Sequence, residues 1–137
     1  MDTSGRNAWV RSALVFGLAY FAIGRGSTLP DSHVQWWRLA AWAASAVVYT
    51  AHIAYEHIRL RDAPRALASH VALAVAIGAL ALAIAGMVHA QSNGSGIRPA
   101  WFLALLVWPA VTAIPAFLGA LIAASLLTRL WRGGDQA

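Results

Sequence analysis

Four long runs of apolar residues, separated by short polar links, organise this chain. The runs cover about residues 8–24, 37–58, 66–89 and 100–127. Each run approaches or exceeds the ~20 residues that a helix needs to cross the hydrocarbon core of a bilayer, and the first is the shortest. Because the links are short, each helix is expected to lie antiparallel beside its predecessor. The pattern predicts an all-α polytopic membrane protein, a bundle of four antiparallel transmembrane helices in a single domain covering residues 1–137.

Composition favours lipid as the solvent for most of the chain. The sequence is 60% hydrophobic and only 11% charged, whereas a water-soluble domain carries roughly a quarter charged residues. No clear small-residue cleavage site follows the first run, so we expect a retained span rather than a signal peptide. The absence of cysteine excludes disulfides, thiolate metal ligands and cysteine nucleophiles.

The positive charges indicate how the spans are oriented. All ten basic residues are arginine, and most of them lie at the start, in the middle link and at the end: Arg6, Arg11, Arg59, Arg61, Arg65, Arg129 and Arg132. Positively charged ends of membrane helices stay on the cytoplasmic side. Both termini and the middle link are therefore predicted to be cytoplasmic, in the inner membrane of a bacterial cell. Since the arginines flank apolar runs, lipid rather than nucleic acid is the expected partner.

The second run carries a polar stripe. Ser45, Tyr49, His52, Glu56 and Arg59 recur at steps of four, three, four and three, which places them on one face of a helix. Glu56 is the one acidic residue within a predicted span, and ionisable groups at such positions usually face the bundle interior or a water-filled cavity. Because Glu56 and Arg59 lie in the last turn, they are also compatible with ordinary interfacial side chains that reach toward water.

The short link after this stripe predicts a partner for Glu56. A turn centred near Asp62 puts Glu56 level with Ser69 and His70, and it puts His52 within one turn of His70. Histidine titrates near neutral pH, and a neighbouring carboxylate raises its pKa. A cluster of His52, Glu56 and His70 is therefore predicted at the cytoplasmic end. Proton relay, cation binding and the pinning of two helices all remain open for it, and the identity of any metal is unknown.

The other histidines suggest one possible cofactor. The same antiparallel geometry brings His33 and His89 within about a turn of each other at the outer end. Two stacked pairs, His52 with His70 and His33 with His89, would suit b-type haem, which takes axial ligands from facing helices. We expect no cofactor, with haem as the one alternative.

Two prolines mark the middle of the fourth run. Pro109 and Pro115 each remove a backbone hydrogen-bond donor and tend to kink a helix, and Thr112 lies between them. Kinked spans often line transport sites, because irregular backbone at membrane depth survives only against protein or water. Pro109, Thr112 and Pro115 are therefore a second candidate site, with packing of a long helix as the alternative explanation.

Three classes of function follow from these features. The leading interpretation is a small, non-enzymatic subunit or scaffold of a larger membrane complex. The first alternative is a small proton- or cation-coupled transporter or channel that acts as a homo-oligomer, since four short spans barely enclose a pathway. The second alternative is a b-type haem-binding membrane protein. Pairs of small residues four positions apart, such as Ala74 with Gly78 and Gly119 with Ala123, permit close helix contacts in any of these cases.

Overall fold

The computed structural model describes residues 3–28, 32–94 and 98–134, and every regular element in that part of the chain is helical. The elements are α1 (Thr3–Gly26), α2 (Val34–Tyr55), the π-helical turn η1 (Glu56–Leu60), α3 (Pro64–Ser92) and α4 (Pro99–Gly134). The prediction of an all-α fold with four long helices is confirmed for these residues. The side chains of Arg6 and Arg132, two of the arginines that indicate the orientation of the spans, lie outside the described residues.

Local sequence explains where the middle helices end. The backbone of Arg61 is left-handed, with φ of 54°, and this terminates η1. Pro64 then stands in the first turn of α3, where its missing N–H leaves no helical bond unmade. The prolines of the fourth predicted run, Pro109 and Pro115, both lie inside α4, which continues through them as one helix. Helix α4 extends further than the apolar run indicates, since it reaches Gly134 rather than ending near residue 127.

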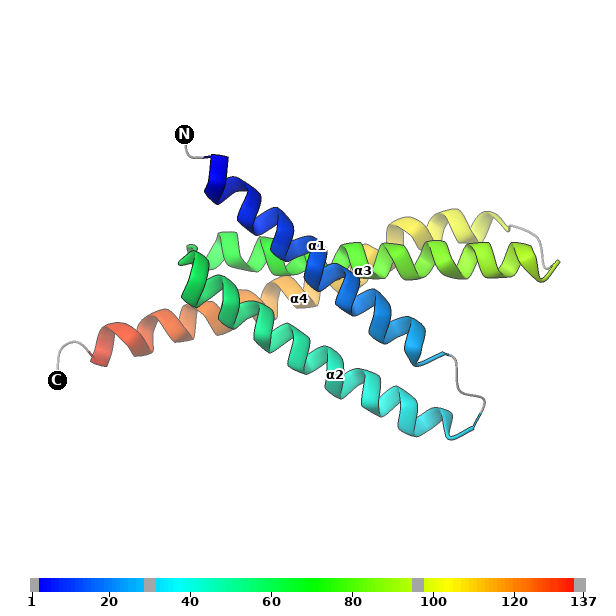
Figure 1. The fold of residues 1–137 in the computed structure, drawn as a ribbon, viewed down its shortest axis with the longest axis horizontal. Coiled ribbons are helices and arrows are strands. Elements are labelled where there is room, and N and C mark those ends of the chain that lie inside the picture. The colour runs from blue at the N-terminus through cyan, green and yellow to red at the C-terminus, as the bar shows by residue number, and fades with distance from the viewer. Residues whose placement is uncertain (1–2, 29–31, 95–97, 135–137) are drawn as a thin grey trace.

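The helices form two antiparallel hairpins that cross at an angle (Figure 1). The most extensive packing is between α3 and α4, and α1 lies across α3. By contrast, α2 makes few contacts with α3 and α4, and its beginning lies well away from them (Figure 1). The beginning of α1, the link between α2 and α3, and the end of α4 all lie at one end of the bundle. We call this the cluster end, because the polar residues described below lie there.

Small residues set the distance between α1 and α3. A Cβ atom added to Gly78 would lie 2.7 Å from Tyr20 Cβ and 2.9 Å from the Gly17 carbonyl oxygen. A Cβ atom added to Gly17 would in turn lie 2.9 Å from Ile77 Cγ2. The two helices therefore touch through their backbones, which is the kind of close contact that small residues allow.

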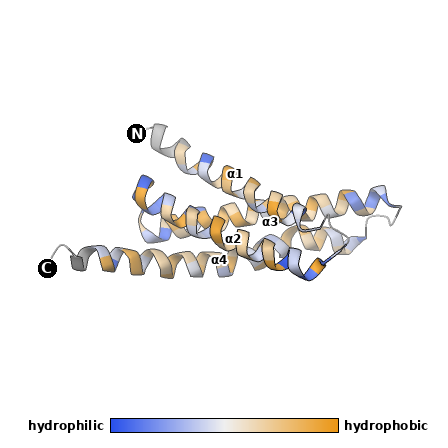
Figure 2. Ribbon diagram, turned by 60° about the horizontal axis from the view of Figure 1, so that its bottom comes forward, coloured by the Kyte–Doolittle hydropathy of each residue, from blue (hydrophilic) through white to orange (hydrophobic). Residues whose placement is uncertain are grey.

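The surface is apolar over most of the length of all four helices, and hydrophilic residues gather near the links (Figure 2). Large exposed side chains include Trp42 at 79% and Leu106 at 74%, whereas the buried core consists mainly of alanines. Among the described residues, two helices are long and apolar enough to cross a membrane, namely α3 and the Pro99–Trp131 part of α4.

Candidate functional site: a buried histidine–carboxylate cluster

Glu56 is fully buried at the junction of α1, η1 and α3. Its Oε1 lies 3.3 Å from His52 Nε2, and its Oε2 lies 2.9 Å from His70 Nδ1. His52 is also fully buried, and His70 retains 16% of its exposure. The structure thus brings together the three residues of the predicted cluster, with the glutamate between the two histidines.

Helix α1 adds contacts that the sequence analysis does not predict. The Ser12 hydroxyl donates a hydrogen bond to Glu56 Oε1 and lies 3.2 Å from His52 Nε2. Phe16 stacks on the His52 ring at a centroid distance of 4.0 Å, and Trp9 stacks on His70 at 4.7 Å. These side chains recur at steps of three and four along α1, so the same periodicity that reveals the stripe in α2 could have revealed them.

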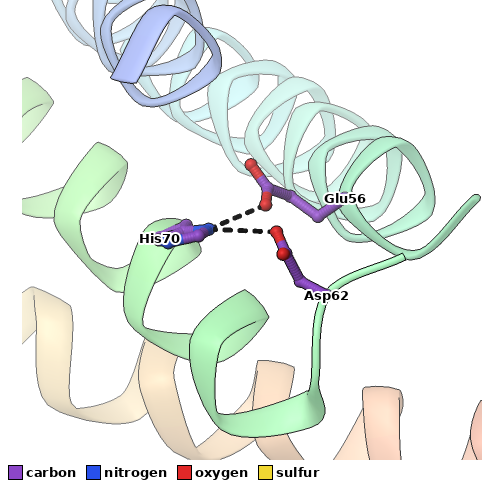
Figure 3. Close-up of side chains that lie close together, drawn as sticks. All are labelled: Glu56, Asp62 and His70. Carbon is purple, nitrogen blue, oxygen red and sulfur yellow. Dashed lines mark hydrogen bonds and ion pairs between the residues drawn. The ribbon is translucent and has the colours of Figure 1, made fainter. Parts of the chain in front are cut away.

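Asp62 joins the cluster from the link between η1 and α3. Its Oδ2 lies 3.4 Å from His70 Nδ1, the same nitrogen that contacts Glu56 (Figure 3). The left-handed backbone of Arg61 ends η1 and reverses the chain, which brings Asp62 back toward Glu56. π-Helical turns are rare and occur frequently at functional sites. Hairpin geometry predicts Asp62 only as the centre of the turn, so its contact with His70 is a new element of the site.

The hydrogen bonds constrain the protonation of the cluster. Since the Ser12 hydroxyl already donates to Glu56, the Nε2 of His52 carries a hydrogen that can be donated to Glu56 or Ser12. Nδ1 of His52 is buried without a hydrogen-bond partner, and burying an unpaired N–H is costly, so Nε2 is the better position for the ring hydrogen. One hydrogen on His70 Nδ1 then faces two carboxylates, and Asp62 Oδ2 has no hydrogen-bond partner of its own.

The charge of Asp62 is disfavoured by its surroundings. Burial, together with the adjacent Glu56 carboxylate, raises the pKa of Asp62 above its usual 3.8, and His70 opposes this effect only in part. The Asp62 side chain keeps 28% of its exposure, so water reaches it from one side. The cluster therefore holds two carboxylates close together, and the side-chain partners found for them among the described residues are Ser12, His52 and His70.

A cavity of about 520 Å³ opens beyond the cluster, between the diverging part of α2 and the other helices. Its walls are mainly apolar, and its polar lining residues include Tyr20, Ser45, Tyr49 and Thr112. The Tyr49 hydroxyl donates a 2.6 Å hydrogen bond to the Ala116 carbonyl oxygen. Ser45 and Tyr49, the candidate residues at the start of the predicted polar stripe, thus line this cavity, and Thr112 of the second candidate site lines it as well.

A second hollow, of about 680 Å³, lies on the other side of the cluster. Asp62 lines it together with His57, Arg61 and the α4 residues Thr128 and Trp131. Along α2 and its link, the order is therefore Tyr49 at the cavity, His52 and Glu56 in the cluster, and Asp62 at the second hollow.

The remaining candidate residues have local roles in the structure. His33 caps the beginning of α2 with a left-handed backbone, with φ of 56°. His89 Nε2 lies 2.9 Å from the side-chain amide nitrogen Nδ2 of Asn93. For the inner pair, the Glu56 carboxylate occupies the space between His52 and His70 where a haem iron would have to lie. We therefore do not propose haem.

The atoms best placed to hold a cation are Glu56 Oε2, Asp62 Oδ2 and His70 Nδ1, which come from η1, the link and α3. A set of one ligand atom from each of these residues lies within 4.8 Å of one another. Comparisons with protein families, with curated proteins and with solved structures found no match for this chain.

Proposed function

We propose that this chain is a four-span protein of the cytoplasmic membrane that passes a proton or another small cation through its centre, acting as an oligomer. The observation that carries the proposal is the complete burial of Glu56 between two histidines. Removing a carboxylate from water costs several kcal/mol, and apolar residues of similar volume often serve stability equally well. Ionisable residues within membrane segments typically mark ion or proton pathways.

The surroundings of the cluster support a pathway. Asp62 lines the second hollow and Tyr49 lines the cavity, and His52 and Glu56 lie between these two residues along the chain. The cavity is open rather than enclosed, and residues of all four helices line it. A second copy of the chain that closed this opening would complete the enclosure, which is why we include an oligomer in the proposal.

Flux through reconstituted vesicles tests this function. Vesicles that contain the protein and a pH-sensitive dye are given a membrane potential, negative inside, with a potassium gradient and valinomycin. Parallel vesicles are given a sodium or a zinc gradient. We expect wild-type protein to raise the flux of at least one cation above protein-free vesicles, Glu56→Gln to remove that increase, and His33→Ala to retain it. Wild-type flux equal to that of protein-free vesicles for all three ions would refute the proposal.

The four-span topology has a separate test, because the chain has no cysteine. Single cysteines at Ser27 and Ser92 should react with an impermeant maleimide from the outer side of the membrane, and one at Ala63 should react only after permeabilisation. If the cysteine at Ser27 is protected while the one at Ser92 reacts, α1 and α2 do not cross, and the protein is a two-span hairpin of α3 and α4.

A subunit or scaffold role is the second candidate, and the exposed apolar faces favour it. Large side chains such as Phe102, Leu106 and Leu130 are more than 60% exposed along α4. Lipid covers such a face in an isolated protein, and a partner helix covers it in a complex. Purification in a mild detergent distinguishes the two, since stoichiometric membrane partners support a subunit and a homogeneous homo-oligomer counts against it.

A further inference from the structure

Three ligand atoms of different residues converge beside η1 (Figure 3). Glu56 Oε2 lies 2.9 Å from His70 Nδ1, which in turn lies 3.4 Å from Asp62 Oδ2. We propose that Glu56, Asp62 and His70 bind a divalent transition-metal cation, and that such a cation is the species on which the protein acts. The second half of this statement rests on the proposed transport function, whereas the binding itself does not.

The distances suit a single ion. Zinc lies about 2.0–2.2 Å from nitrogen and oxygen ligands, so two ligand atoms on one tetrahedral ion are roughly 3.3–3.6 Å apart. The separation of His70 and Asp62 already falls in this range. The contact between Glu56 and His70 is shorter by about half an ångström, which a small outward shift of the Glu56 carboxylate corrects. One nitrogen and two carboxylate oxygens suit zinc, manganese or cobalt, whereas calcium prefers six to eight oxygens.

Charge gives an independent reason to expect a cation. Two carboxylates meet at one imidazole nitrogen, and a single hydrogen on that nitrogen cannot satisfy both of them. Asp62 Oδ2 is shielded from solvent and has no hydrogen-bond partner. A divalent cation would neutralise both carboxylates, take the lone pair of neutral His70 and give Asp62 Oδ2 the partner that it lacks.

The groups around the three ligands hold them in place. Oε1 of Glu56, the oxygen that is not a proposed ligand, is held by Ser12 and His52. The His70 ring is held by stacking on Trp9. Hydrogen bonds of this kind orient metal ligands, and removing them typically costs about 10–100-fold in metal affinity. The hollow lined by Asp62 provides a route for entry.

Cobalt binding to the full-length protein tests the site. Protein purified in detergent and freed of metal with a chelator is titrated with Co²⁺, whose visible absorption reports tetrahedral coordination, and Zn²⁺ is then added to displace it. We expect one saturable site per chain. Asp62→Asn and His70→Ala should each weaken binding at least about tenfold, whereas His57→Ala, at the edge of the same hollow, should leave it unchanged.

Circular dichroism controls for folding, and Asp62→Asn is the decisive variant because Asp62 is a partly exposed link residue whose loss spares the helices. Wild-type protein that binds no Co²⁺, or variants that bind it as wild type does, would overturn the inference. If binding is absent while protons still flow through vesicles, the metal site is refuted and the proposed function stands. If binding is present while no ion flows, the site stands and transport of the metal is refuted.

Discussion

The two ends of α2 differ in how they are held. At the cluster end, His52, Ile53 and Glu56 are buried, and Ile53 packs in a core cluster with residues of α3 and α4. At the opposite end, α2 diverges from α3 and α4, and Trp36 and Trp42 are 71% and 79% exposed. Within α2 itself, only His52 and Ile53 are buried among the described side chains.

This contrast indicates what attaches α2 to the bundle. Apolar burial contributes little along most of its length, so the attachment is concentrated at the cluster end, where the polar contacts of His52 and Glu56 lie beside the core contacts of Ile53. A purely structural clamp and a cation site make the same contacts in the static structure. Substitutions in the cluster separate them, because substitutions in a clamp change stability alone, whereas substitutions in a cation site also change cation binding and flux.

The largest effect is expected from Glu56→Ala. The substitution leaves His52, His70 and Ser12 without their shared acceptor, and breaking a buried charged pair typically costs about 3–5 kcal/mol. Unfolding by SDS in mixed micelles measures the loss, and Glu56→Gln serves as the matched variant, because its amide oxygen still accepts a hydrogen bond. A loss below about 1 kcal/mol for Glu56→Ala would show that the cluster does not hold α2.

A smaller effect on stability is expected where α1 crosses α3, outside the cluster. In Gly78→Ala the new methyl group would lie 2.9 Å from the Gly17 carbonyl oxygen, so the helices must separate. Overpacking of this kind costs about 1–3 kcal/mol. Gly26→Ala is the control, since nothing lies within 4 Å of the atom it adds. Equal stability of the two variants in the same SDS assay would contradict the close backbone contact.

Helical periodicity and hairpin geometry account for the part of the cluster that could be predicted. They place His52 and Glu56 on one face of α2 and His70 at the same level of α3. Ser12 was missed because a serine in an apolar span carries no signal alone, although its spacing from Trp9 and Phe16 repeats at three and four.

Other features depend on geometry that periodicity does not contain. The contact of Asp62 depends on a π-helical turn that ends in a left-handed residue, and a regular helix would place Asp62 elsewhere. The cavity depends on the angle at which α2 leaves the bundle, and a bundle in which each helix lies antiparallel beside its predecessor does not predict that angle. The predicted four-span membrane topology stays a prediction, since among the described residues only α3 and α4 are apolar enough to indicate membrane crossing by themselves.

Tyr49 lies at the boundary between the clamped and the diverging part of α2. Tyr49→Phe removes its hydrogen bond to the Ala116 carbonyl, the one side-chain hydrogen bond from α2 to α4 among the described residues. A bond of this type contributes about 0.5–1.5 kcal/mol, and Tyr55→Phe is a control at a more exposed tyrosine. If Tyr49→Phe has no effect in the SDS assay, this hydrogen bond does not help to fix α2.

The smallest effect is a dependence of stability on pH that arises from Asp62. Because burial and Glu56 raise its pKa, the folded protein holds this proton more tightly than the unfolded chain does. Folding stability from this group therefore rises as the pH falls from above the raised pKa toward the usual value of 3.8. Stability is measured between about pH 6 and 4 with a chelator present. As the pH falls, wild-type protein should lose less stability than Asp62→Asn, which cannot take up this proton. The difference is small because Asp62 is 28% exposed and water screens its charge. Identical slopes of stability against pH in the two proteins would mean that water, rather than the cluster, sets the environment of Asp62. Glu56 and Asp62 would then not interact electrostatically at the cluster end.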